Sequence, residues 1–308
     1  MQVPLVIFGL AIGLILLVRG ADEMIKCAIH IAQKYKIPQS IVGAVYIGFG
    51  TSAPEWVAST AAVLQGNLSL AIGNIIGSNI ANSLLVLSIM FLLVEKGINK
   101  KLNLNLISSN WMLVVTAVFI AGYLFLDSFS RPLGMVLLAC MFIAIRSMMG
   151  KEDSSVENSM DQVKVKNLAL RSILSIAATI YGSKLVVDSA IELAAIFNVS
   201  SLVVGVVVVA FGTSLPEIVS TVSAAKFNKP EIVFGNIFGS NLFNVGLVGG
   251  TSLLIAPGKL DSEITFQLLA MAAASIFVIY ISRQKIQKNY PIGIMLFLLY
   301  LVFILSLF

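Results

Sequence analysis

The sequence predicts an all-α polytopic membrane protein with ten transmembrane helices, arranged as two inverted-topology repeats of five helices. Three observations lead to this prediction. Hydrophobic residues make up 58% of the chain and charged residues only 11%, whereas soluble domains carry about 25% charged residues. Apolar stretches long enough to cross a bilayer recur along the whole chain. The second half of the chain repeats the first at a fixed offset.

The apolar stretches define the predicted spans, because a spanning helix needs about 20 mostly apolar residues. The predicted spans are residues 3–32, 40–64, 68–94, 106–126, 132–149, 167–195, 201–226, 230–255, 262–282 and 290–307. The longest polar connection, residues 150–166, divides the chain into a first five-helix repeat, 1–149, and a second, 167–308. The N-terminal stretch lacks a basic leader and a small-residue cleavage site, so it is expected to remain as the first span.

The distribution of basic residues predicts the orientation. With the N-terminus outside, the inner loops and helix ends hold fifteen Lys and Arg residues, while the outer ones hold Arg131 and Lys259. Basic residues collect on the cytoplasmic side of membrane proteins. We therefore expect a multi-pass protein of the plasma (inner) membrane, with both termini extracytoplasmic and the 150–166 loop cytoplasmic. The same rule explains the net charge of +5 and argues against nucleic-acid binding.

The internal repeat has an offset of 162 residues. Residues 42–82 align with residues 204–244 without a gap. GFGTSAPE at 48–55 corresponds to AFGTSLPE at 210–217, and GNIIGSNIAN at 73–82 corresponds to GNIFGSNLFN at 235–244. Five spans separate the copies, so they enter the membrane from opposite sides. In transporters built this way, substrate binds near the bilayer midplane on interrupted helices.

Two glutamates are the strongest candidates for function. Glu55 and Glu217 are the acidic residues that fall near the middle of long apolar spans. A carboxylate at that depth is costly and must be balanced by a cation, a basic partner or a proton. Since no Lys or Arg lies within eight residues of either glutamate, we favour a cation site over a structural ion pair.

The residues around the glutamates supply oxygen atoms. Helical spacing places Thr51, Ser52 and Ser59 on the face of Glu55, and Thr213, Ser214 and Thr221 on the face of Glu217. Asparagine and serine recur four residues apart on the next spans, at Asn74, Ser78 and Asn82 and at Asn236, Ser240 and Asn244. Carboxylate, amide and hydroxyl oxygens suit Ca²⁺ or Na⁺ better than Zn²⁺ or Cu²⁺.

Proline and glycine add a backbone contribution. Pro54 and Pro216 each remove a helical hydrogen bond, which should free the carbonyls of Gly50 and Gly212 as further ligands. The glycines of the repeated segments are expected to allow close helix packing. We also expect structural ion pairs between Asp22 and Lys26 and between Lys184 and Asp188, which are four residues apart on spans one and six.

These motifs resemble those of the cation/calcium antiporter superfamily, and within it the prokaryotic Na⁺/Ca²⁺ exchangers. The H⁺/Ca²⁺ branch typically carries glutamate after its Gly-Asn pair, where this chain has Gly77-Ser78 and Gly239-Ser240. The resemblance implies a secondary antiporter, not an enzyme, that binds Na⁺ and Ca²⁺ as substrates within the lipid bilayer. It implies no cofactor and no obligatory protein partner.

The resemblance also implies residue roles. Glu55 and Glu217 would be shared ligands of Ca²⁺ and Na⁺, and Asn82 and Asn244 would lie at the central level of the site. Spans one and six would slide across a stationary bundle. The remaining implied ligands are the hydroxyl or backbone oxygens of Thr51, Ser52, Ser78, Thr213, Ser214 and Ser240, and the carbonyls of Gly48 and Ala210.

One departure from the family pattern bears on potassium. Potassium-dependent members, and some prokaryotic ones, carry Asp at the position of Asn244, so we expect K⁺-independent exchange here. We also expect electrogenic exchange, because two carboxylates neutralise one Ca²⁺ whereas the added neutral oxygens allow more than two Na⁺ to bind. Two alternatives stay open. One is an antiporter that exchanges H⁺ for Ca²⁺ or another divalent cation, because a carboxylate can take up a proton in place of a metal. A non-transporting membrane scaffold or receptor is the other, although a scaffold would gain nothing from paired midplane glutamates.

Overall fold

The computed structural model describes residues 2–93, 104, 106–126, 129–149, 165–197, 212, 214–259, 264–284 and 290–307. Within these residues the chain is helical throughout, apart from turns and one isolated antiparallel bridge between Phe129 and Gly258. Seven of the described helices are long and apolar enough to cross a membrane, and Tyr290–Leu305 is a shorter apolar helix. The prediction of an all-α polytopic membrane protein is therefore confirmed.

The first half of the chain forms five consecutive helical segments in the described residues. Two of them contain a π-helical turn, at η1 and η2. The segments are α1 (Gln2–Tyr35); α2 (Gln39–Val42) with η1 (Gly43–Ile47) and α3 (Gly48–Leu64); α4 (Leu68–Ala81) with η2 (Asn82–Val86) and α5 (Leu87–Leu93); α6 (Leu106–Leu126); and α7 (Arg131–Met148).

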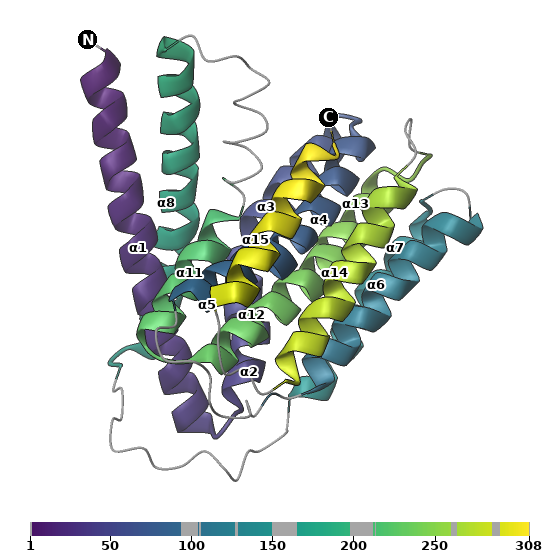
Figure 1. Cartoon of the computed structure of the whole chain (residues 1–308), viewed down its shortest axis with the longest axis horizontal. Helices are drawn as coiled ribbons and strands as arrows, with labels where there is room; N and C mark the ends of the chain where they lie inside the picture. Colours follow the sequence, from purple (N-terminus) through teal and green to yellow (C-terminus); the bar gives the residue numbers. More distant parts are fainter. Residues whose placement is uncertain are drawn as a thin grey trace.

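The second half follows the same order. Its segments are α8 (Leu168–Ile196); α11 (Leu215–Lys226); α12 (Pro230–Phe243) with η4 (Asn244–Gly249) and α13 (Gly250–Ile255); α14 (Thr265–Ser282); and α15 (Tyr290–Leu305). The predicted seventh span, 201–226, is described only in its second part, as α11. Both chain termini lie at the upper end of the molecule in Figure 1.

Helices α1 and α8 pack side by side and form a pair at one side of the slanted bundle of the other helices (Figure 1). Gly9 of α1 faces Ser189 of α8, whereas Gly20 faces Thr179, so the two helices run antiparallel. Gly20 and Gly182 are 162 residues apart. A Cβ on Gly182 would overlap the backbone at Leu17, and one on Gly20 would lie 2.8 Å from the Thr179 nitrogen. The inverted repeat predicts such a reciprocal, antiparallel contact between equivalent helices.

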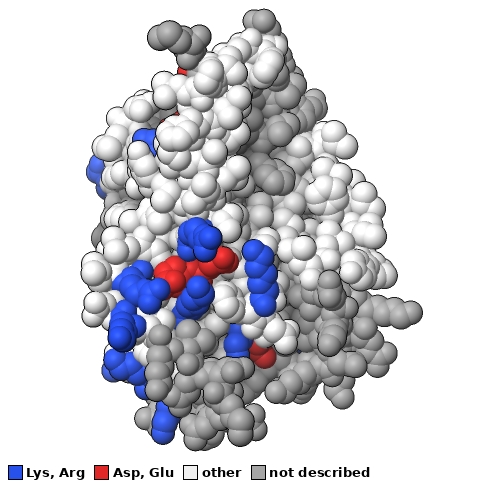
Figure 2. Space-filling model, turned by 90° about the vertical axis from the view of Figure 1, so that its left-hand side faces the viewer, with Lys and Arg blue, Asp and Glu red and all other residues white. Residues whose placement is uncertain are grey.

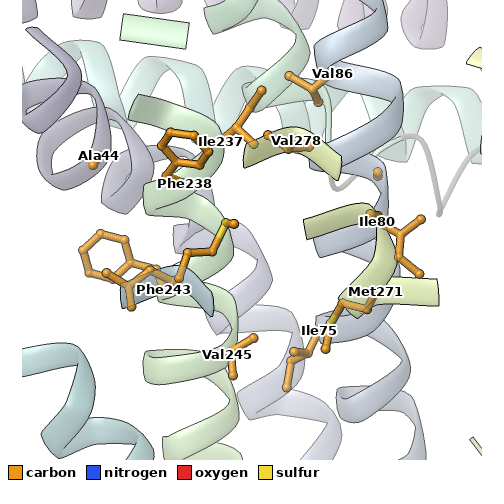
Figure 3. Packing of buried hydrophobic residues seen from close by; sticks show 14 of the residues in the cluster. Ala44, Ile75, Ile80, Val86, Ile237, Phe238, Phe243, Val245, Met271 and Val278 are labelled. Atoms are coloured by element: carbon orange, nitrogen blue, oxygen red, sulfur yellow. The ribbon is translucent and has the colours of Figure 1, made fainter. Parts of the chain in front are cut away.

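The core surrounds α4 and α12, the helices that follow the two glutamate segments. In the most apolar 18-residue window of each span, 94% is buried for Pro230–Ile255 and 83% for Leu68–Leu93, compared with 22% for α1. Figure 3 shows Met271 of α14 beside Ile75 and Ile80 of α4, and Phe238 of α12 beside Ala44 of η1. Every residue of α12 from Ile232 to Phe243 is buried, so its polar residues are enclosed by protein.

Close approach of α12 to the second segment depends on two glycines. A Cβ on Gly235 would overlap the Ser40 carbonyl, and one on Gly239 would overlap the Ala44 carbonyl. This confirms the packing role at these two glycines, whereas a Cβ on Gly73 or Gly77 would meet no atom within 4 Å, so the expectation is wrong there. The contact brings α12, from the second half of the chain, against α2, η1 and α3 from the first half.

Candidate ion-binding site

The two predicted glutamates are buried inside the bundle. Glu55 lies on α3 and Glu217 in the first turn of α11, and each is 1% exposed. None of their four carboxylate oxygens has a hydrogen-bond partner in the described residues. The two described ion pairs involve neither glutamate. Two buried carboxylates in this situation require a bound cation or a proton.

The helix around the first glutamate differs from the prediction. Pro54 was expected to interrupt its span, but α3 continues through Pro54 from Gly48 to Leu64. The irregular turn lies before it, at η1, where the π-helix holds one more residue per turn. The expectation of a break at Pro54 is therefore wrong. The Gly50 carbonyl still lacks its usual partner, because proline has no N–H to donate.

The helix around the second glutamate begins close to it. Ser214 precedes α11, and Pro216 lies in the first turn. Backbone N–H groups in the first turn have no acceptor within the helix, so proline costs no hydrogen bond there. The N-terminus of a helix favours negative charge, which suits Glu217. The Gly212 carbonyl, which was expected to be free, accepts a hydrogen bond from the Ser183 hydroxyl of α8 at 3.2 Å. The second segment thus contacts α8 directly.

A hydroxyl cluster joins the two halves beside the glutamates. The Thr51 hydroxyl of α3 lies 3.0 Å from the Ser240 hydroxyl and 3.2 Å from Asn236 Oδ1, both on α12. It also approaches the Gly48 carbonyl at 3.5 Å. The Ser52 hydroxyl donates to the Ser240 carbonyl at 3.5 Å. The structure therefore brings together four of the predicted oxygen-bearing positions, at residues 48, 51, 52 and 240.

The neighbouring helix α4 contributes further oxygens to the region. Asn74 donates from Nδ2 to the Ser59 hydroxyl at 2.9 Å and to the Glu55 carbonyl at 3.5 Å. The buried hydroxyls of Ser78 and Ser214 have no hydrogen-bond partner among the described residues. Each is a free oxygen in a buried, polar setting. Thr213 and Ala210, which were also predicted as ligands, lie outside the described residues.

The two central asparagines occupy the same structural position in their repeats. Asn82 begins η2 and Asn244 begins η4, and they are 1% and 0% exposed. Their side chains differ in contacts. Asn82 Nδ2 donates to Asn241 Oδ1 at 3.1 Å, whereas neither side-chain atom of Asn244 has a partner in the described residues. Single π-helical turns are frequent at functional sites, and the sequence analysis did not anticipate them.

Sequence reasoning also missed two asparagines next to the site. Asn79 and Asn241 are completely buried, and each donates from Nδ2 to the main-chain carbonyl of the other at 3.5 Å. The repeat could have revealed them, because Asn79 follows Ser78 just as Asn241 follows Ser240. They were overlooked because they lie off the four-residue spacing of the other polar positions.

The charged residues of α1 and α8 pair differently from the prediction. Lys26 lies 3.9 Å from Glu23, which also pairs with Arg171 of α8 at 2.8 Å. Asp22 instead accepts a hydrogen bond from the Ser223 hydroxyl of α11 at 2.5 Å. In the described residues no ion pair joins Lys184 to Asp188. Both predicted pairings are wrong, and for the residues of α1 the contacts with α8 and α11 decide which partner each carboxylate meets.

Known proteins resemble this chain in sequence and in fold. The sequence model of the family described as sodium/calcium exchanger protein matches residues 5–149 and 167–308. The sodium/calcium exchanger MaX1 of Methanosarcina acetivorans is 29% identical over 349 aligned positions, covering 97% of each chain. The inner membrane protein YrbG of Escherichia coli is 29% identical over 305 aligned positions, covering 93% of this chain and 92% of YrbG.

A solved structure agrees over the whole fold. The sodium-calcium exchanger NCX_Mj, soaked with Na⁺ and Ca²⁺, matches with a TM-score of 0.81 and 28% sequence identity, covering 99% of each chain. The family match covers most of the chain, both glutamate segments included. This chain belongs to the sodium/calcium exchanger protein family.

Proposed function

We propose that this chain is a secondary active antiporter that exchanges Na⁺ for Ca²⁺ across the membrane by alternating access. The supporting observation is the pair of buried glutamates, Glu55 and Glu217, with four carboxylate oxygens that no described group contacts by hydrogen bond. Two carboxylates neutralise one divalent cation, and the surrounding oxygens extend its coordination. Ca²⁺ takes six to eight oxygen ligands in flexible geometry.

The proposed ligands comprise the glutamates and the oxygen-bearing residues of both repeats. Thr51, Ser52 and Ser240 already form one cluster between α3 and α12. By the symmetry of the repeat, Thr213 and Ser214 would complete a second cluster with Ser78. Asn82 and Asn244 would lie at the level between them. Na⁺ would use the same glutamates, together with the carbonyls of Gly48 and Ala210.

The arrangement of α1 and α8 supports a division into a moving pair and a bundle. Their glycine-lined interface holds the two helices together, and Glu23 of α1 pairs with Arg171 of α8. Contacts of α1 with the bundle include α11, through the Asp22–Ser223 hydrogen bond. We propose that α1 and α8 slide together across the bundle to expose the site to either side.

The charge distribution supports the proposed orientation. Figure 2 shows Lys and Arg side chains mostly over the lower half of the α1 and α8 side, away from the end that carries both termini in Figure 1. Basic residues favour the cytoplasmic side, so the termini would be extracytoplasmic and the 150–166 loop, between repeats 1–149 and 167–308, cytoplasmic. A relative is named as an inner membrane protein, which favours the plasma membrane for this chain.

Proton-coupled exchange of Ca²⁺ or another divalent cation is the second candidate. It is favoured by the same unpartnered carboxylates, since each can bind a proton instead of sharing a metal ion. The serines at positions 78 and 240 favour the Na⁺ branch of the resemblance. The two candidates differ in the ion that drives Ca²⁺ transport, Na⁺ or H⁺, and therefore in the net charge moved in each cycle.

Flux measurements with imposed gradients test the proposed function. Purified protein is reconstituted into proteoliposomes, and ⁴⁵Ca²⁺ uptake is followed after imposing an outward Na⁺ gradient or an outward H⁺ gradient. Na⁺ exchange predicts uptake with the Na⁺ gradient that persists when a protonophore abolishes any pH difference. Uptake driven by the H⁺ gradient and indifferent to Na⁺ would instead establish the second candidate.

A further inference from the structure

Asn79 and Asn241 form a reciprocal contact between the two repeats. They are equivalent at the offset of 162 residues, and each side-chain Nδ2 donates to the other's main-chain carbonyl at 3.5 Å. Both are completely buried on α4 and α12. The contact therefore joins the two central helices next to Ser78, Asn82 and their counterparts, although neither asparagine belongs to the proposed ligand set.

The Asn79 carbonyl fixes the orientation of the Asn241 amide. A main-chain carbonyl can only accept a hydrogen bond, so the Asn241 end that faces it must be the donor, Nδ2. The same Nδ2 donates to the Ser83 hydroxyl at 3.0 Å. Its Oδ1 consequently faces Asn82, whose Nδ2 donates to it at 3.1 Å. The Asn82 amide is thereby turned so that its unpartnered Oδ1 remains available as a ligand.

On the other side the carbonyl contact is repeated, from Asn79 Nδ2 to the Asn241 carbonyl, but contacts equivalent to Asn241–Ser83 and Asn82–Asn241 are not formed in the described residues. Ser83 corresponds to Val245 at the offset of 162, so the Asn79 amide meets no hydroxyl there. Both amides approach a methionine sulfur, since Asn79 Nδ2 lies 3.6 Å from Met271 Sδ and Asn241 Nδ2 lies 3.7 Å from Met112 Sδ. The Asn79 Oδ1 has no partner in the described residues, and neither has the Asn244 side chain. The difference of serine against valine accompanies a hydrogen-bonded Asn82 on one side and an Asn244 whose side chain has no partner in the described residues on the other.

We infer that Asn241 is a positioning residue for ion binding, which holds the Asn82 amide with its oxygen presented to the transported ion. Asn79 has no such role toward Asn244. The inference rests on the proposed function, because it assumes that Asn82 contributes to the ion site. It makes the two central asparagines unequal: Asn82 is oriented before an ion binds, whereas Asn244 must be turned by the ion itself.

A double-mutant cycle tests this inference. Ca²⁺ affinity is measured by isothermal titration calorimetry on purified full-length protein in Na⁺-free buffer, for Asn82→Ala, Asn241→Ala and the double variant. Each single variant should raise the Kd about tenfold, or about 1.4 kcal/mol. The double variant should bind no more weakly than either single one, because both remove the same oriented oxygen. The matched cycle, Asn79→Ala with Asn244→Ala, should show effects that multiply.

Three results would overturn the inference. One is a double variant about a hundredfold weaker than the parent, which would show independent effects at 82 and 241. Another is equal coupling in both cycles. The third is unchanged affinity in Asn82→Ala, which would also remove Asn82 from the site. In contrast, failure of the proposed function would appear in the parent protein, as the absence of Na⁺-driven Ca²⁺ flux.

A conservative variant covers the case in which Asn241→Ala does not fold. Ser83→Ala removes one acceptor of the Asn241 amide and leaves Asn82 and Asn241 in place. It should raise the Ca²⁺ Kd in the parent but have no effect in the Asn82→Ala background. A purely structural role would lower the melting temperature of the Ca²⁺-free protein equally in both backgrounds and leave the Kd unchanged, which would contradict the inference.

Discussion

The hydroxyl oxygens of Thr51 and Ser240 lie 3.0 Å apart, although one belongs to the first repeat and the other to the second. The glycines of α12 allow this approach, because any larger residue at Gly239 would collide with the chain at Ala44. The proposed site is therefore shared between the repeats, and its oxygens depend on how closely α3 and α12 pack. Ion binding by the site and the close packing of its helices can be tested by separate substitutions.

Removing either central charge should abolish exchange. Glu55→Gln or Glu217→Gln leaves one carboxylate to balance a divalent ion in a buried setting, which should cost about 3 kcal/mol or more. We expect ⁴⁵Ca²⁺ flux to fall at least about a hundredfold, while the monodisperse protein is retained on size-exclusion chromatography. Glu231→Gln, in the first turn of α12, is the matched control and should transport normally. Near-normal flux in either site variant would disprove the assignment.

Potassium should have no part in transport. Asn82 and Asn244 are amides, so the central level offers no third carboxylate to hold a K⁺ ion beside Ca²⁺. Replacing K⁺ by an inert organic cation on both sides of proteoliposomes should leave Na⁺-driven Ca²⁺ flux unchanged. Asn244→Asp adds the carboxylate that the central level lacks, and the same flux measurement on this variant shows whether that carboxylate makes transport depend on K⁺. A requirement for K⁺ in the parent protein would show that the branch assignment is wrong.

Transport should carry net charge. With Ca²⁺ bound the two ionised glutamates leave the site roughly neutral, whereas neutral oxygens allow more than two Na⁺ to bind at once and leave it positive. One charge moving through the membrane is worth about 2.3 kcal/mol per 100 mV. Proteoliposomes clamped with valinomycin at two K⁺ gradients should therefore differ in Na⁺-driven Ca²⁺ uptake. Equal rates and end-points would favour electroneutral exchange of two protons.

Helix packing gives a prediction about stability that does not involve ions. Gly239→Ala would place a methyl group against the Ala44 carbonyl, so the free energy of unfolding should fall by about 1–3 kcal/mol or more. Gly249→Ala lies on the same span, and its nearest atom to a new Cβ is 3.7 Å away. It should be neutral or gain up to about 1 kcal/mol. Thermal melting in detergent measures both, and equal melting temperatures would contradict the packing account.

The sequence predicted the helices and the buried glutamates, because each depends on composition or on spacing along one segment. Glu55 lies in the middle of an apolar span, which predicts a buried side chain, and its side chain is 1% exposed. The π-helical turns at Asn82 and Asn244 were not predictable in this way, since an extra residue in a turn leaves no distinct pattern of side chains.

Contacts between helices were the least predictable feature. Asp22 and Lys26 have the spacing of an ion pair, yet Lys26 lies nearer Glu23, and Asp22 meets Ser223. Helical geometry permits pairing at three or four residues, and neighbouring helices decide between them. The Gly212 carbonyl was likewise expected to be free, but Ser183 of α8 donates to it. Only the packed structure identifies these partners.

Competition between Ca²⁺ and Na⁺ at one site is the central claim, and equilibrium binding measures it directly. Calorimetric titration of the purified protein with Ca²⁺ at increasing Na⁺ should give one Ca²⁺ site per chain. Its apparent Kd should rise with more than the first power of Na⁺ concentration, and the binding should vanish in Glu55→Gln and Glu217→Gln. A Kd that is unaffected by Na⁺ and rises only as the pH falls would contradict the account and establish proton coupling.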